Sequence, residues 1–135
     1  MSRTVLFLCP HNAAKSVIAA ADFARLAAER GLAATADSAG TQPDQGPAPA
    51  VVAALRAEGV DVGGHRPRLV TADDLAGAWR VVSLGCDPAA LEAAGSRLVR
   101  WDDVPPPTQG LAAVREDIRR RVAGLVEELA GAGGA

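Results

Sequence analysis

Residues 5–16, VLFLCPHNAAKS, constrain the fold of this chain more than any other stretch. The stretch begins with a short run that is apolar throughout, as in a parallel strand buried on both faces. A loop follows, and an alanine-rich helical pattern starts at Ser16. This order places Cys9 at the carboxyl end of a strand and below the amino end of a helix. Backbone N–H groups and the helix dipole favour an anion and a thiolate at such a position.

Apolar runs and helical patterns alternate along the rest of the chain. The predicted strands cover residues 5–9, 33–37, 79–84 and 97–101. The predicted helices cover residues 16–30, 49–58, 87–94 and 111–130, and a capping-box pattern predicts a further short helix after residue 71. The alternation predicts an α/β fold with a four-stranded parallel sheet flanked by helices on both faces. We expect one domain over residues 1–130 and a flexible tail over residues 131–135.

Composition excludes several classes of function. A chain of 135 residues with a net charge of −2 fits one globular domain and offers no basic surface for nucleic acid. Its apolar runs are far shorter than the roughly 20 residues of a membrane span. Two cysteines, Cys9 and Cys86, are too few for a secreted disulfide scaffold, and they and the two histidines lack metal-ligand spacing. The sequence predicts a cytoplasmic protein with free thiols and no metal.

The loop after Cys9 has the composition of an oxyanion site. Successive backbone N–H groups of residues 10–15 would converge on a tetrahedral anion, and Lys15 would neutralise its charge. The Ser16 hydroxyl could donate a hydrogen bond to the Cys9 thiolate. Lys15 is the only lysine among the fourteen basic residues, so its place in this loop runs against the composition of the chain.

Residues 9–16, CPHNAAKS, resemble the signature loop C-x-x-N-x-x-R-S of the low-molecular-weight tyrosine phosphatases and of the arsenate reductases that share their fold. Three more segments resemble family motifs in the same order: SAGT at 38–41, GVD at 59–61 and VSLGC at 82–86. The pair His11-Asn12 and the cysteine at position 86 look more like the reductase branch. The resemblance covers nearly the whole chain and implies the phosphotyrosine phosphatase I-like fold, in agreement with the alternation described above.

The resemblance also implies roles for individual residues. Cys9 would attack the anion, and a second thiol, such as Cys86, would release the product. Asn12 would hold the loop in a strained conformation, and Ser38 would hydrogen-bond to Asn12. The implied oxyanion-binding residues are Pro10, His11, Asn12, Ala13, Ala14 and Lys15. The implied catalytic residues are Cys9, Lys15, Ser16, Cys86 and Asp103.

The sequence departs from the family pattern at three functional positions. Lys15 stands in place of an arginine, which would offer a planar fork to two oxygens of the anion. Pro105-Pro106 stands where the family has Asp-Pro, so that Asp102 and Asp103 are the only nearby candidates for a general acid, unless they cap a turn. Ala93 stands where the thioredoxin-coupled reductases have a third cysteine.

Three functions are compatible with these features. The first is reduction of arsenate, with no bound cofactor and with an external thiol as reductant, either thioredoxin or a small-thiol system with glutaredoxin. The second is a weak phosphatase acting on phosphotyrosine or small phosphate esters. The third is an oxyanion-binding protein without catalytic activity. In each case the ligand is arsenate or a phosphate-like oxyanion, and neither nucleic acid nor a membrane takes part.

Overall fold

Four strands form one sheet in the order β2-β1-β3-β4, and every neighbouring pair is parallel. The structure is a computed structural model, and it describes residues 3–133. The strands are β1 (Arg3–Leu8), β2 (Ala34–Ala39), β3 (Arg80–Ser83) and β4 (Leu98–Arg100). The helices are α1 (Lys15–Glu29), α2 (Pro49–Arg56), α3 (Ala72–Gly77) and α4 (Leu111–Gly133), with the 3-10 helices η1 (Pro88–Arg97) and η2 (Pro107–Gln109). The predicted α/β fold is confirmed.

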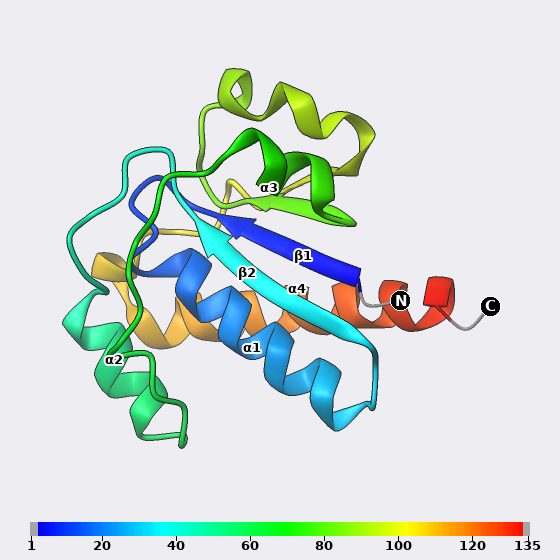
Figure 1. The fold of residues 1–135 in the computed structure, drawn as a ribbon. Helices are drawn as coiled ribbons and strands as arrows, with labels where there is room; N and C mark the ends of the chain where they lie inside the picture. The colour runs from blue at the N-terminus through cyan, green and yellow to red at the C-terminus, as the bar shows by residue number, and fades with distance from the viewer. Residues whose placement is uncertain (1–2, 134–135) are drawn as a thin grey trace.

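Strand β1 lies between β2 and β3 and is covered on both faces, which explains its apolar sequence. Val5 and Phe7 pack in a core with residues of α1 and α4. Leu6 and Leu8 point to the opposite face, where they pack with residues of α3 and η1. Figure 1 shows α3 on one side of the sheet and α1 and α4 on the other. The predicted helical layers on both faces are therefore present.

The carboxyl ends of the strands meet at one edge of the sheet because all four strands are parallel. Cys9 follows β1, Gly40 follows β2 and Leu84 follows β3. Strand β1 has β2 on one side and β3 on the other, so its end is the switch point of the sheet, where open α/β sheets bind their ligands. The fold therefore places Cys9 where the sequence predicted an anion site.

Most predicted boundaries differ from the structure by one to three residues, and two of these differences concern the site or the predicted tail. Helix α1 begins at Lys15, and the residue before it, Ala14, makes no side-chain cap. The predicted helix starts at Ser16, but Ser16 lies in the first turn of α1 and its hydroxyl contacts the sulfur of Cys9. Helix α4 continues to Gly133, so residues 131–133 of the predicted tail belong to a helix. Residues 134 and 135 of that tail lie outside the described residues.

A charge cluster joins α1, the end of α2 and α4. Arg115 of α4 and Arg25 of α1 both donate to the carboxylate of Glu58, with Nη2–Oε1 and Nη1–Oε1 distances of 2.9 Å and 3.2 Å. The Arg115 bond holds the pKa of Glu58 well below its usual value, at about 2. Asp22, only 3% exposed, lies 3.7 Å from Arg115, and burial raises the pKa of its carboxyl. Glu58 thus fixes the loop after α2 against the two long helices.

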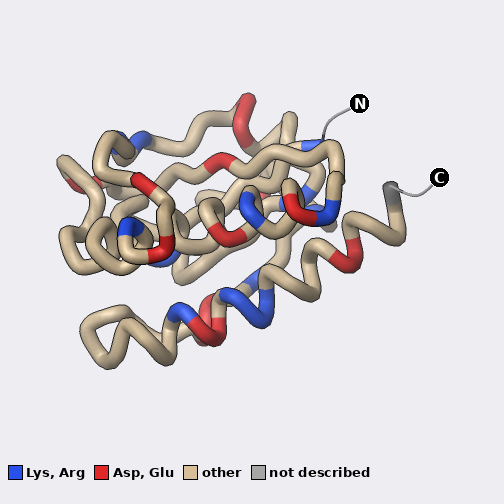
Figure 2. Tube along the Cα trace, turned by 90° about the horizontal axis from the view of Figure 1, so that it is seen from below, with Lys and Arg blue, Asp and Glu red and all other residues tan. Residues whose placement is uncertain are grey.

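Charges of both signs lie next to each other along α4 (Figure 2). This mixture agrees with the expectation that the chain offers no extended basic surface. Between residues 3 and 133, no helix has the length and the apolar character that crossing a membrane requires.

We expect Glu58→Gln to lower the free energy of unfolding by about 2 kcal/mol at neutral pH, because it removes charge-assisted bonds to two arginines. The native pKa of Glu58 lies below its ordinary value of 4.5, so this contribution is present above about pH 4.5 and is lost as the pH falls toward about 2. Urea unfolding at several pH values measures the difference between the variant and the unsubstituted protein. Glu92→Gln, at an exposed position without an ion pair among the described residues, is the control. An equal loss at low and neutral pH would contradict this account.

Candidate active site

The loop between β1 and α1, residues 9–14, turns its carbonyl groups outward. Four consecutive carbonyls accept hydrogen bonds from outside the loop, three from backbone N–H groups of residues 42–48 and one from a histidine ring. The bonds are Gln42 N to Pro10 O at 2.7 Å, Asp44 N to His11 O at 3.0 Å, His65 Nε2 to Asn12 O at 2.9 Å, and Ala48 N to Ala13 O at 2.9 Å. The loop is therefore held by its carbonyl side.

The N–H groups of this loop face the opposite direction. In a trans peptide the N–H of one residue points away from the carbonyl of the residue before it. Four outward carbonyls therefore turn the N–H groups of residues 11–14 inward, and none of these has a hydrogen-bond partner among the described residues. Consecutive N–H groups at the start of a helix bind an anion. The residues predicted to form an oxyanion cradle thus have the backbone arrangement that such a cradle needs.

A chain of hydrogen bonds leads from this loop to the sulfur of Cys9. The backbone N–H of Arg68 donates to Asn12 Oδ1 at 3.1 Å, and Asn12 Nδ2 donates to Ser16 Oγ at 2.9 Å. Ser16 Oγ lies 3.0 Å from Cys9 Sγ, and the Ser16 backbone N–H donates to the same sulfur at 3.4 Å. Asn12 and Ser16 are fully buried and Cys9 is 4% exposed.

The direction of this chain follows from its first donor. A backbone N–H can only donate, so the Asn12 atom that it contacts must be the carbonyl oxygen. The amide group of Asn12 then faces Ser16 and donates to its hydroxyl oxygen. The Cys9 thiol donates to the same oxygen, and when the sulfur is ionised the Ser16 hydroxyl can turn to donate to it beside the Ser16 backbone N–H. Such an arrangement is compatible with a thiolate.

Asn12 keeps its place through an unusual backbone conformation and a close neighbour. Its φ angle is +51°, and within residues 3–133 no other residue except glycine has a positive φ. Asparagine tolerates this left-handed conformation better than most residues. Gly40, just after β2, packs against the loop so closely that an added Cβ would lie 2.6 Å from Pro10 O and 2.8 Å from Cys9 O. The glycine of the SAGT segment is therefore required by the approach of two backbones.

A cavity of about 330 Å³ opens above the sulfur of Cys9. Lys15 lines it and its ammonium donates to Val104 O at 3.3 Å, so the cation spans from the start of α1 to the segment after β4. Apart from Cys9 and Lys15, the lining residues are Pro10, His11, Ala13, Ala14, Asp44, Ala48, Pro106 and Pro107. The structure therefore brings together the predicted nucleophile, the predicted cation and the loop.

Two residues predicted for the site lie elsewhere. Asp103 is 79% exposed and its carboxylate pairs with Arg121 of α4 at 3.0 Å, so it does not line the cavity. The bond from Arg121 also holds the pKa of Asp103 below its usual value. A carboxyl that loses its proton more readily is less suited to donate one at neutral pH. The predicted hydrogen bond between Ser38 and Asn12 is not present among the described residues. The Asn12 side chain accepts the backbone N–H of Arg68 at Oδ1 and donates to Ser16 Oγ from Nδ2.

Asp102 and Cys86 belong to one turn beside the site. The Asp102 carboxylate accepts the Ser83 hydroxyl at 2.9 Å and the Gly85 N–H at 2.8 Å, and the Cys86 N–H donates to Ser83 Oγ at 3.2 Å. Cys86 is 4% exposed. Burial, and secondly the negative charge of Cys9, raise the pKa of the Cys86 thiol to about 11. Cys86 is therefore a buried thiol in the turn after β3, where burial disfavours its ionisation, and Asp102 is the acceptor that orders this turn.

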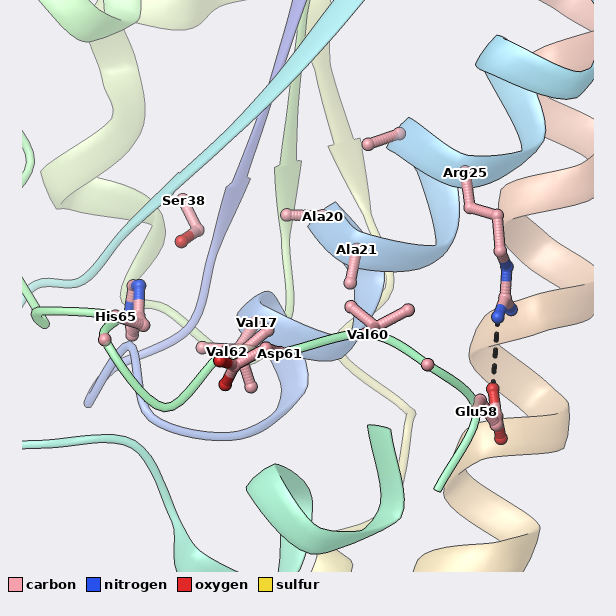
Figure 3. A pocket seen from close by; sticks show the side chains of 13 residues that line it. Val17, Ala20, Ala21, Arg25, Ser38, Glu58, Val60, Asp61, Val62 and His65 are labelled. Atoms are coloured by element: carbon pink, nitrogen blue, oxygen red, sulfur yellow. Dashed lines mark hydrogen bonds and ion pairs between the residues drawn. The ribbon is translucent and has the colours of Figure 1, made fainter. Parts of the chain in front are cut away.

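A larger cavity, of about 770 Å³, lies on the far side of the loop (Figure 3). Ser38 and His65 lie at one end of it, and the Arg25–Glu58 ion pair lies at the other. His65 connects this cavity to the site because its ring donates to Asn12 O. The cavity contains neither a cysteine nor the inward N–H groups, so the smaller cavity above Cys9 is the candidate active site.

Sequence comparison assigns the chain to a family. The family described as low molecular weight phosphotyrosine protein phosphatase matches residues 4–94, which include every strand but β4 and the whole loop. The chain belongs to this family. The predicted family is therefore confirmed, and the matched residues include the loop at residues 9–16.

Relatives of this phosphatase-family chain include reductases. A protein of Halobacterium salinarum, provisionally named an arsenate reductase, is 31% identical over 127 residues, which are 90% of this chain and 89% of that protein. YfkJ of Bacillus subtilis has a similar structure, with a TM-score of 0.81, 26% identity and coverage of 96% and 95% of the two chains. A thioredoxin-dependent arsenate reductase of Corynebacterium glutamicum also has a similar structure, with a TM-score of 0.82 and 26% identity. The match covers 95% of this chain and 62% of that longer chain.

Several contributors to the site could not be recognised in the sequence. Arg68 acts through its backbone N–H, which no sequence pattern reports. His65 supports the loop through Asn12 O, a contact between residues 53 positions apart that only the fold reveals. Asp44 was not singled out, because it lies in a loop with no motif. Within residues 3–133, no group of three or more His, Cys, Asp or Glu residues is arranged to hold a metal ion.

We expect Gly40→Ala to weaken binding of inorganic phosphate by at least about tenfold, because the new methyl group must push the loop carbonyls away. Calorimetry measures this affinity. Gly124→Ala is the control, since Gly124 lies on the exposed face of α4 with no atom within 4 Å of an added Cβ. That control should bind phosphate normally and gain up to about 1 kcal/mol of stability. Normal binding by Gly40→Ala would contradict the proposed fit.

We expect Ser16→Ala to slow alkylation of Cys9 by iodoacetamide about tenfold at about pH 7, because the thiolate loses a charge-assisted bond. Mass spectrometry of the two cysteine peptides measures the rate and shows which thiol reacts. Cys86 should stay unmodified under these conditions. Ser83→Ala, which removes a buried hydroxyl beside Cys86, should leave the Cys9 rate unchanged. Equal rates in the two variants would argue against the directed chain of bonds.

Proposed function

We propose that this protein is a thiol-dependent arsenate reductase in which Cys9 is the nucleophile. The observation that favours a reductase over a phosphatase is a second buried thiol, Cys86, in the turn beside the site. A reductase needs a second thiol to release its product, whereas a phosphatase does not. The 31% identical relative named as an arsenate reductase supports the same choice.

In the first step the inward N–H groups and Lys15 bind the arsenate oxygens. The thiolate of Cys9 attacks arsenic, an S–As bond forms, and one As–O bond breaks. The departing oxygen takes up a proton and leaves as water, so arsenic stays in the pentavalent state. Ser16 contributes before this step, since it donates to the sulfur and favours its ionised form.

In the second step another thiolate attacks the sulfur of Cys9. An S–S bond forms, the electron pair of the S–As bond goes to arsenic, and arsenite leaves in the trivalent state. Cys86 lies near Cys9 but is buried and protonated, so it needs a rearrangement of its turn to act. We propose that an external thiol, thioredoxin or a small thiol, supplies the electrons, either directly at Cys9 or by reducing a Cys9–Cys86 disulfide.

We expect the protein to reduce arsenate when supplied with a thioredoxin system or with a small thiol and glutaredoxin, and Cys9→Ser to be inactive. Oxidation of NADPH in the coupled assay and direct measurement of arsenite give the rate. Cys86→Ser separates the two routes, because loss of turnover identifies Cys86 as the second thiol and unchanged turnover identifies the external thiol.

The control is an alkylation assay, which establishes that Cys9 is reactive in the same preparation. Reactive Cys9 without turnover by any thiol system would contradict the proposal. In that case, Cys9-dependent hydrolysis of an aryl phosphate would identify a phosphatase. Binding of arsenate or phosphate without either reaction would identify an oxyanion-binding protein.

A further inference from the structure

We infer that His11 is the proton donor of the first step, oriented by Gln42 and Asp44, an assignment that rests on the proposed reaction. Hydroxide is a much poorer leaving group from arsenic than water, so the departing oxygen needs a proton in the transition state. Asp102 is bonded to Ser83 and Gly85, and Asp103 to Arg121, so neither carboxylate is available at the cavity. The donor must therefore be sought among the residues that line the cavity itself.

Four ionisable residues line this cavity: Cys9, His11, Lys15 and Asp44. Cys9 is the nucleophile, and an ammonium such as that of Lys15 ordinarily keeps its proton far above neutral pH. A carboxyl such as that of Asp44 ordinarily loses its proton well below neutral pH. Imidazole is the side chain that ordinarily exchanges a proton between about pH 5 and 8. Among these four residues, His11 has the chemistry of a proton donor at neutral pH.

The contacts of the His11 ring fix which nitrogen can act. Nδ1 lies 3.1 Å from the carbonyl oxygen of Gln42, and a carbonyl can only accept, so Nδ1 carries a proton. Asp44 Oδ1 lies 3.7 Å from the same nitrogen, and the Asp44 N–H donates to His11 O at 3.0 Å. Nε2, on the other side of the ring, has no hydrogen-bond partner among the described residues. The ring, whose side chain is 59% exposed, is therefore anchored at Nδ1, and we assign Nε2 as the nitrogen that meets a ligand in the cavity that His11 lines.

This anchoring allows proton transfer without rotation of the ring. The imidazolium carries protons on both nitrogens, and Asp44 Oδ1 lies 3.7 Å from Nδ1. As Cys9 attacks, the Nε2 proton passes to the departing oxygen, which leaves as water. The ring becomes the neutral tautomer with its proton on Nδ1, which keeps the bond to Gln42 O. Charge balances, since the thiolate and the imidazolium are consumed together and the adduct retains the single negative charge of dihydrogen arsenate.

The test compares His11→Asn and Asp44→Asn with the unsubstituted protein in arsenate reduction, with the thiol reductant in excess so that the first step limits the rate. Asparagine places an amide donor near the position of Nδ1 and lacks Nε2. We expect His11→Asn to lower kcat about 100-fold or more, within the range of general acid catalysis. Its affinity for inorganic phosphate and its rate of Cys9 alkylation should change less than about threefold, since the cradle amides remain.

The pH profile distinguishes proton donation from a structural role. In the unsubstituted protein kcat should fall on the alkaline side as the imidazolium is lost, and this limb should disappear in His11→Asn. Asp44→Asn, which removes the carboxylate near Nδ1 and leaves Lys15 and Cys9 unchanged, should lower kcat by less than His11→Asn does and should keep the alkaline limb. An unchanged kcat and profile in His11→Asn, or a fall in kcat matched by weaker phosphate binding, would overturn the assignment alone. If the unsubstituted protein reduces no arsenate, the proposed function falls, and this assignment falls with it.

Discussion

The site depends on one obligatory donor, the backbone N–H of Arg68. Because this group can only donate, it determines the orientation of the Asn12 amide, which in turn donates to the Ser16 hydroxyl that lies against Cys9 Sγ. Each member is a buried side chain or a backbone group, so water does not readily replace a lost partner. The sulfur of Cys9 is thereby held in a fixed position at the end of a strand.

The loop and its surroundings form one unit. The outward carbonyls of residues 10–13 are bound by a segment after β2 and by His65, while the left-handed φ of Asn12 bends the loop around the cavity. The same bonds that satisfy the carbonyls turn the N–H groups inward. Gly40 allows the supporting strand to approach this closely. The anion site is thus a consequence of how the loop is supported from behind.

The chemistry around Cys9 differs from what the family pattern implies at the positions where carboxylates are expected. The turn that carries Cys86 uses Asp102 as its internal acceptor, and α4 holds Asp103 at the surface. What remains beside the anion is a lysine, a histidine and the carboxylate that accompanies it. A second thiol lies close by but is buried and protonated, so its use requires movement of its turn.

The sequence by itself determined the elements, the parallel sheet and the cradle. An apolar strand before Cys9 and a helix after it require the thiol to sit at a strand end, and the SAGT and CPHNAAKS segments carry the family resemblance. The mixed charge pattern and the short length of the apolar runs also follow directly from the sequence, because they do not depend on folding. The predicted ends of the helices were less accurate. Serine is a residue type that often caps a helix, but the Ser16 hydroxyl contacts Cys9 instead, so a tertiary contact outweighs the local preference.

Only the tertiary structure decided which groups meet the anion. The partners of Asn12 are the N–H of Arg68 and the hydroxyl of Ser16 rather than Ser38, and Asp44 rather than Asp103 reaches the cavity. The bonds of the loop to Arg68 and to residues 42–48 join segments more than thirty residues apart in sequence, and hydrogen bonds form or fail over distances of a few tenths of an ångström. Sequence spacing sets the order of residues along the chain, whereas packing of the loops sets which of them touch.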